Sequence, residues 1–297
     1  MSAPVFEMAG IDKSYPFFKL EGVRMQLAPG QIMGFIGANG AGKSTTLRIL
    51  MGLLPPDRGE VRLLGHAMPA GQALAKRDVG FVSEEMRLYG LNTLEWHMQF
   101  VASVVPCWDA GYAQLLLERF NLHPQQKVKG LSHGQRMKAV LLLALARRPR
   151  LLVLDEPMTG LDPVARQEIL TELMDIVTDE QRSIVFSSHN TQDVEQISDQ
   201  ITFIDRGRII ESTDKEVFLD KWRRLQLELP AGKALPPFAG VVDVTSSGRT
   251  AVVTTKTFTP ELPSFYQQIG AVVREIQHMT LEEIFVAEVM SSRKGTP

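Results

Sequence analysis

Two kinds of hydrophobic spacing alternate along this chain and predict an α/β fold. Residues 31–36, 79–83, 151–154 and 183–186 are short, mainly apolar runs, as expected for buried strands. The run at 151–154 is apolar without interruption, which is typical of a parallel strand covered on both faces. Apolar residues at helical spacing follow several of these runs. We therefore expect a mostly parallel sheet with helices between its strands.

Two segments depart from this alternation. Apolar and polar residues alternate at 23–27, which indicates a half-buried antiparallel sheet near the N-terminus. Residues 84–130 show no strand pattern, and natural helix N-caps occur at Asn92 or Thr93 and at Asp109. We expect this stretch to be a helical subdomain inserted in the main domain.

The composition changes again near the C-terminus. After an expected helix at 214–223, a run of prolines and glycines indicates a loosely structured link; it contains Pro230, Gly232, Pro236, Pro237 and Gly240. Short strand patterns and a last helix at 280–289 follow. We therefore predict a main domain over residues 1–223 and a small α+β accessory domain over residues 224–297.

Composition limits the classes of protein that remain. The net charge is −2, so no general basic field indicates a nucleic-acid partner. The one cysteine, Cys107, fits a reducing cytoplasm. The N-terminus shows no signal segment, and the longest apolar run, 139–146, is shorter than the ~18 residues that span a bilayer. We expect a soluble, cytoplasmic protein.

Residues 37–45 predict a nucleotide-binding loop. The loop matches the spacing G-x-x-x-x-G-K-S and lies between a strand pattern and a helix pattern over 45–54. Glycines let backbone N–H groups turn toward phosphate oxygens, and the helix start adds its own unpaired N–H groups. Lys43 should reach the β- and γ-phosphates, and the Ser44 hydroxyl should hold Mg²⁺. The residues expected to bind nucleotide here are Gly37, Asn39, Gly40, Gly42, Lys43, Ser44 and Thr45.

Two carboxylates, Asp155 and Glu156, directly follow the apolar run at 151–154. Open α/β sheets bind ligands at the carboxyl ends of their strands. We expect Asp155 to hold Mg²⁺, directly or through water, and Glu156 to orient an attacking water as general base. A helix-capping acidic pair is the weaker alternative.

Three further positions are ambiguous when each is taken alone. Ser132 is a natural N-cap for a helix whose first turns carry cations, so an arriving anion would relieve the unfavourable charge; a solvated basic helix start is the alternative. Tyr15 could stack on adenine, or it could be a partly buried loop residue. His189 follows the apolar run at 183–186 and could contact a γ-phosphate, or it could be solvated.

Taken together, residues 3 to about 220 resemble the ATP-binding subunits of ABC transporters. Residues 37–45 match the Walker A motif, 131–135 the LSGGQ segment with His133 in place of a glycine, and 151–156 Walker B with its catalytic glutamate. Residues 160–163 match the D-loop, and Tyr15 and His189 match the adenine-stacking aromatic and the switch histidine. The ordered set of motifs is highly specific.

The resemblance implies a mechanism and partners. Two copies would pack head to tail, so that ATP on one copy meets Ser132, Gly134 and Gln135 of the other. Glu156 and His189 would complete the site, and hydrolysis would open the dimer. The segment 84–130 would receive an integral membrane permease, which places the protein on the inner face of the cell membrane. The C-terminal Thr280-Leu281-Glu282-Glu283-Ile284-Phe285 is similar to that of ABC-2 type exporters.

One departure from the family pattern concerns Glu84, where the family usually has glutamine. A carboxylate adds charge beside phosphates, so it could bind Mg²⁺ more tightly or repel the γ-phosphate. We expect Glu84 to be a coupling and metal-site residue. Two other classes remain open, a soluble ABC ATPase acting on ribosomes or DNA and a P-loop kinase. The kinase gives no reason for residues 131–135 or 160–163.

Overall fold

The computed structural model describes residues 3–178, 182–230 and 235–294 of the chain. The chain divides into two compact units, residues 1–212 and 213–297. In the described part of the chain, no helix combines the length and apolar character needed to cross a membrane.

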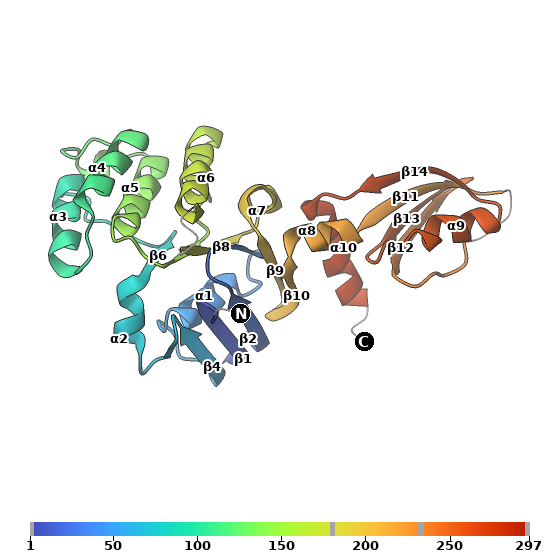
Figure 1. Ribbon diagram of the computed structural model, residues 1–297, viewed down its shortest axis with the longest axis horizontal. Coiled ribbons are helices and arrows are strands. Elements are labelled where there is room, and N and C mark those ends of the chain that lie inside the picture. The colour runs from blue at the N-terminus through green and yellow to red at the C-terminus, as the bar shows by residue number, and fades with distance from the viewer. Residues whose placement is uncertain (1–2, 179–181, 231–234, 295–297) are drawn as a thin grey trace. The chain divides into compact units, whose positions relative to one another are not determined.

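A six-stranded sheet forms the centre of the first unit (Figure 1). Its strands, in spatial order, are β10 (Arg208–Asp214), β9 (Gln200–Asp205), β3 (Ile32–Ile36), β8 (Ser183–Ser188), β7 (Leu151–Asp155) and β6 (Val79–Ser83). All pairings from β9 to β6 are parallel, and β3, β7 and β8 are buried along their whole length. Because parallel strands point the same way, the carboxyl ends of β3, β8, β7 and β6 meet at one edge. The predicted mostly parallel α/β core is confirmed.

An antiparallel sheet accompanies this core. Its order is β2 (Phe18–Leu27), β1 (Phe6–Tyr15), β4 (Arg58–Leu63) and β5 (His66–Ala67). Helix α1 (Lys43–Leu50) packs Leu47 and Leu50 in one apolar cluster with Met8 of β1 and Val153 of β7. The first helix of the core therefore lies where both sheets can cover it.

The predicted helical segment between Glu84 and Gly130 is present. Thr93 caps α3 (Leu94–Val104) by accepting from the Trp96 N–H at 3.1 Å, and Asp109 caps α4 (Ala110–Arg119) by accepting from Tyr112 at 2.8 Å. The remaining helices of the unit are α2 (Gln72–Ala75), α5 (His133–Leu145), α6 (Pro163–Val177) and α7 (Thr191–Ile197), with short 3-10 turns at Lys76–Asp78 and Val128–Gly130.

The second unit has its own core. Its elements are α8 (Lys215–Lys221), β11 (Arg223–Glu228), β12 (Val241–Ser247), β13 (Thr250–Thr255), α9 (Glu261–Gln268), β14 (Val272–His278) and α10 (Leu281–Lys294). The strands form one antiparallel sheet in the order β12-β13-β11-β14. Leu225 and Leu227 alternate with half-exposed residues along β11 and pack with Val253, Leu262 and Tyr266. This period of two gives the sheet one buried face.

Several boundaries differ from those the sequence predicts. The helix expected over 45–54 ends at Leu50, with Met51 as its C-cap and Gly52 at a φ of 61°, before the prolines can act. The division between the units falls after Ser212 rather than after Arg223, because β11 pairs directly with β13 and β14 and α8 leads straight into it. Gly232 of the expected link lies outside the described residues.

Candidate nucleotide-binding site

The loop between β3 and α1 is shaped by glycines. Gly42 has a φ of 115°, and a Cβ there would lie 2.7 Å from a side-chain carbon of Leu20. A Cβ on Gly37 would lie 2.6 Å from the backbone oxygen of Ile204. Both positions therefore exclude larger residues, and the loop can close tightly over the start of α1. Its N–H groups and the helix start make a site suited to phosphate.

Lys43 lies at the centre of the site. Its side chain is 5% exposed, and Nζ donates to the Gly37 carbonyl at 2.6 Å. The same ammonium forms an ion pair with Glu156 Oε1 at 2.9 Å. Lys43 therefore joins the end of β3 to the end of β7, at the position where the sequence predicts phosphate binding.

Ser44 and Asp155 also meet, as expected for a shared metal site. The Ser44 hydroxyl donates to Asp155 Oδ1 at 3.0 Å. Ser187, at the end of β8, donates to the same oxygen at 2.8 Å and accepts from the Glu156 N–H at 2.9 Å. Ser187 thus orients both acidic residues, a role that the sequence analysis missed because its only signal was a polar residue ending a buried strand.

Glu156 is held by groups from three elements. Its Oε2 lies 2.8 Å from His189 Nδ1 and accepts from the Thr159 hydroxyl at 3.1 Å, while Lys43 pairs with Oε1. Its backbone is left-handed, with a φ of 54°, a strained conformation for a residue with a side chain. Burial raises the pKa of the Glu156 carboxyl, but Lys43 and then His189 outweigh burial and hold the pKa below its ordinary value.

A cavity of about 720 Å³ opens beside these residues. It is lined by Phe17, Phe18, Asn39, Gly40, Gly42, Lys43, Ser44, Thr45, Glu84, Glu156, Thr159 and His189. The structure therefore brings Glu84 into the same cavity as Lys43 and Ser44. Gly37 and Asp155 lie just behind its wall, where they accept hydrogen bonds from Lys43 and Ser44.

The aromatic side of the cavity differs from the one predicted. Among the described residues, Phe17 and Phe18 line the cavity and Tyr15 does not. The Tyr15 ring stands 6.4 Å from that of Phe18, centroid to centroid, and is 43% exposed. Tyr15 ends β1, Phe17 lies in the turn and Phe18 begins β2, so sequence spacing alone could not select among the three rings.

The residues expected from the LSGGQ segment lie elsewhere. Ser132 caps α5: its hydroxyl accepts from the Gln135 N–H at 3.2 Å, and its own N–H donates to the Gln135 side chain at 2.9 Å. Within the described chain, Ser132, Gly134 and Gln135 do not line the cavity that holds Lys43. Ser132 is exposed, so the free end of α5 faces solvent in the single chain.

A P-loop, two consecutive acidic residues and a histidine at the ends of three neighbouring strands, β3, β7 and β8, define the class of protein: a P-loop nucleotide-hydrolysing protein. The family model of the ABC transporter matches residues 20–159. The ABC transporter ATP-binding protein YtrB of Bacillus subtilis is 25% identical over 276 residues, which cover 93% of this chain and 94% of that one. Nod factor export ATP-binding protein I of Paraburkholderia xenovorans is 32% identical over 216 residues, 71% of each chain.

A solved structure gives the same result. An ATP-binding subunit of an ABC transporter has a TM-score of 0.67 and 26% identity, covering 73% of this chain and 92% of that chain. The chain therefore belongs to the ABC transporter family, as one of its ATP-binding proteins, and it is an ATPase.

Proposed function

We propose that two copies of this chain bind two ATP molecules between them, head to tail, and that hydrolysis drives a separate membrane permease. One observation carries the dimer: the nucleotide cavity is lined by the P-loop and the strand ends, whereas the exposed end of α5 lies outside it in the single chain. Ser132, Gly134 and Gln135 of a second copy would supply the missing wall. Their helix start offers unpaired N–H groups to a γ-phosphate.

The residues of each site have separable roles. Lys43 would exchange its contacts with Gly37 and Glu156 for the β- and γ-phosphate oxygens. Glu156 would then be free to accept a proton from the attacking water, with His189 and Thr159 fixing its other oxygen. When phosphate leaves, the start of α5 in the second copy loses the γ-phosphate that it binds, and the dimer opens.

The oxygen atoms near Ser44 suit Mg²⁺. Ser44 Oγ and Asp155 Oδ1 are 3.0 Å apart, and Glu84 lines the same cavity. Hydroxyl and carboxylate oxygens are the ligands that Mg²⁺ prefers, with substrate phosphates completing its shell. Bound there, the ion would neutralise charge on the phosphates. Ser44 and Asp155 would hold it, and Glu84 would adjust its affinity.

Glu156→Gln tests the hydrolytic dimer. The variant should bind ATP, hydrolyse it at least about a hundredfold more slowly, and accumulate as a nucleotide-bound dimer, because the base is lost while the phosphate contacts remain. Light scattering with ATP and phosphate release check the two effects. Normal turnover would remove Glu156 from the mechanism, and a monomer at saturating ATP would remove the dimer.

Glu84→Gln tests the metal role. The variant restores the family's usual residue, and we expect a several-fold rise in the Mg²⁺ concentration needed for half-maximal hydrolysis, because a carboxylate ligand becomes a neutral amide. A titration of Mg²⁺ at fixed ATP measures it, with Glu85→Gln as the matched neighbour, whose carboxylate pairs with Arg48 instead. An unchanged Mg²⁺ requirement would show that Glu84 does not serve the metal.

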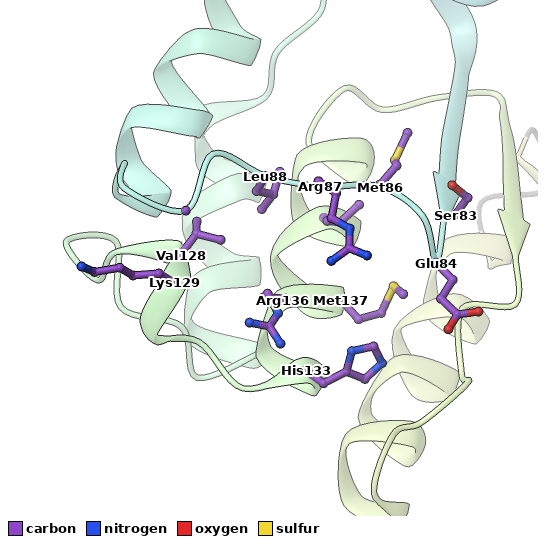
Figure 2. A pocket seen from close by; sticks show the side chains of 12 residues that line it. Ser83, Glu84, Met86, Arg87, Leu88, Val128, Lys129, His133, Arg136 and Met137 are labelled. Carbon is purple, nitrogen blue, oxygen red and sulfur yellow. The ribbon is translucent and has the colours of Figure 1, made fainter.

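The helical segment supports a permease partner. A second cavity of about 460 Å³, hereafter the groove, lies between the end of β6 and α5 (Figure 2). Arg87, Lys129 and Arg136 line it and form no ion pair with any described residue. Exposed aromatic rings lie on α3 and just before it. The Trp96 ring stacks on the Phe100 ring, with their centroids 5.4 Å apart.

The basic side chains of the groove suit an amphipathic helix with carboxylates on its polar face, and the exposed rings of α3 offer aromatic contacts to a partner. We propose that the helix belongs to the permease and that the protein is held at the cytoplasmic face of the cell membrane by it. The relatives' names include a Nod factor export protein, which favours export over uptake.

Charge reversal tests this partner. The full chain purified from detergent-solubilised membranes should bring down an integral membrane protein, and Arg87→Glu with Lys129→Glu should reduce the yield at least about tenfold through charge repulsion. Arg62→Glu, an exposed arginine of β4 away from the groove, should not change it. Recovery of ribosomes or DNA in place of a membrane protein would favour the soluble class of ABC ATPase.

A further inference from the structure

His133 stands where the LSGGQ segment has a glycine, and its ring contacts Thr159, the residue directly before the D-loop of the same chain. The ring nitrogen Nε2 lies 2.9 Å from the backbone oxygen of Thr159. A carbonyl oxygen only accepts hydrogen bonds, so Nε2 must carry a proton and donate. The contact joins the first residue of α5 to a turn 26 residues further along the chain.

The D-loop backbone is shaped to receive this ring. Gly160 follows Thr159 with a φ of 71°, and a Cβ built there would lie 3.3 Å from His133 Nε2. A side chain at position 160 would therefore be strained by the backbone and crowded by the imidazole. The glycine and the histidine fit one another as a pair.

Thr159 connects His133 to Glu156, because it forms hydrogen bonds with both residues. While its carbonyl accepts from His133, its hydroxyl donates to Glu156 Oε2 at 3.1 Å and its N–H donates to the Glu156 carbonyl at 3.3 Å. Thr159 lines the nucleotide cavity, and His133 lines the groove. In Figure 2 the His133 ring extends from the start of α5 on the side of the groove where Glu84 stands.

We infer that His133 is a positioning residue for hydrolysis: through Thr159 it fixes the orientation of the Glu156 carboxylate and joins the groove to the nucleotide cavity. This inference rests on the proposed role of Glu156 as general base. Orientation matters because a base displaced by about 1 Å can lose up to about a hundredfold in rate. An occupant of the groove that moves the His133 ring would move Thr159 and thereby Glu156.

The experiment compares His133→Ala and Thr159→Val in the full chain, using ATP hydrolysis. Each variant should lower kcat by roughly tenfold and change KM for ATP by less than about twofold, because phosphate binding by Lys43 is untouched. The kcat of the double variant should also fall by roughly tenfold, and not by the product of the two single losses. Both substitutions break the same chain of contacts, so their effects on kcat should not multiply. Multiplying losses would overturn the inference.

Two further variants separate positioning from structural support. His133→Gln keeps an N–H donor at similar reach and should recover kcat to within about threefold of the unmodified protein. His278→Gln replaces an exposed histidine of β14 in the second unit and should leave kcat unchanged. A loss of kcat in His133→Gln as large as the loss in His133→Ala would overturn the inference. If the unmodified protein hydrolyses no ATP, the proposed function fails instead.

Discussion

Glu156 shows most directly how single residues are placed by their neighbours. Its carboxylate contacts Lys43 from α1, Thr159 directly before the D-loop and His189 after β8. Motif spacing indicated Lys43 and Glu156, which follow a glycine-rich loop and a buried strand, and the family resemblance added His189. The sequence analysis missed Thr159 and Ser187, because a threonine in a loop or a serine at the end of a strand has no distinguishing pattern until the neighbouring acid is in place.

The charge of Glu156 makes stability depend on pH. A folded-state pKa below the ordinary 4.5 means that the ionised carboxylate stabilises the fold at neutral pH, and that this contribution disappears as pH falls through the lowered pKa. Glu156→Gln should therefore cost about 1–3 kcal/mol at pH 7 without nucleotide, because buried Lys43 loses its charged partner. The difference in unfolding free energy between this variant and the unmodified protein should shrink below pH 4.5.

Urea unfolding at pH 7 and near the acid limit of stability measures both values. Glu275→Gln, at an exposed site on β14, serves as control and should have no effect at either pH. An equal difference at the two pH values would show that the Lys43 ion pair does not supply the stability.

At the scale of elements, helix ends decide where chemistry is placed. Ser132 caps α5 with a reciprocal pair of hydrogen bonds to Gln135, and Asp162 caps α6 by accepting from the Val164 and Ala165 N–H groups at 2.9 Å. The Ser132 cap was predicted from sequence, since a serine before a helical pattern is a local signal. Helix α5 ends at Leu145, and Arg148, shortly after it, adopts a φ of 50°.

Two substitutions at Ser132 separate its structural role from its proposed binding role. Ser132→Ala should cost about 1 kcal/mol of unfolding free energy, because the Gln135 N–H loses its acceptor. Ser132→Asp keeps a cap and favours the helix dipole, so stability should remain within about 0.5 kcal/mol of the unmodified protein. Its charge should nevertheless repel a γ-phosphate and abolish the ATP-dependent dimer.

Thermal unfolding and light scattering with ATP check this pair of results, preferably in the Glu156→Gln background, where the dimer persists. A stable Ser132→Asp protein that still dimerises normally would show that the start of α5 does not meet the terminal phosphate.

At the scale of the whole molecule, the chain consists of two units with separate apolar cores. The sequence predicted both, because the glycine- and proline-rich link interrupts the hydrophobic pattern. It placed the boundary at Arg223 and missed β11 and α9. In β11, arginines interrupt the alternation of apolar and polar residues. Arg223 is 8% exposed and donates to the carbonyls of Leu219 and Trp222. Such burial of a charged residue is invisible to a hydrophobicity pattern.

Separate cores predict separate unfolding. Leu227→Ala and Leu173→Ala each empty a fully buried position, one in each unit, at a cost of about 2–5 kcal/mol. Each variant should lower the temperature of one calorimetric unfolding transition. ATP with Mg²⁺ should raise the temperature of only the transition that Leu173→Ala lowers, because a ligand stabilises the unit that binds it. A single transition shifted by both variants would show that the units unfold together.

The sequence by itself determined the family, the P-loop, the acidic pair and the helix caps, because these features depend on residues close together in the chain. Only the tertiary structure decided which distant residues share a cavity. Glu84, Ser187 and His189 meet Glu156 or Ser44 because four parallel strands end at one edge. The contact between His133 and Thr159 likewise depends on how α5 packs beside the D-loop, which no local pattern specifies.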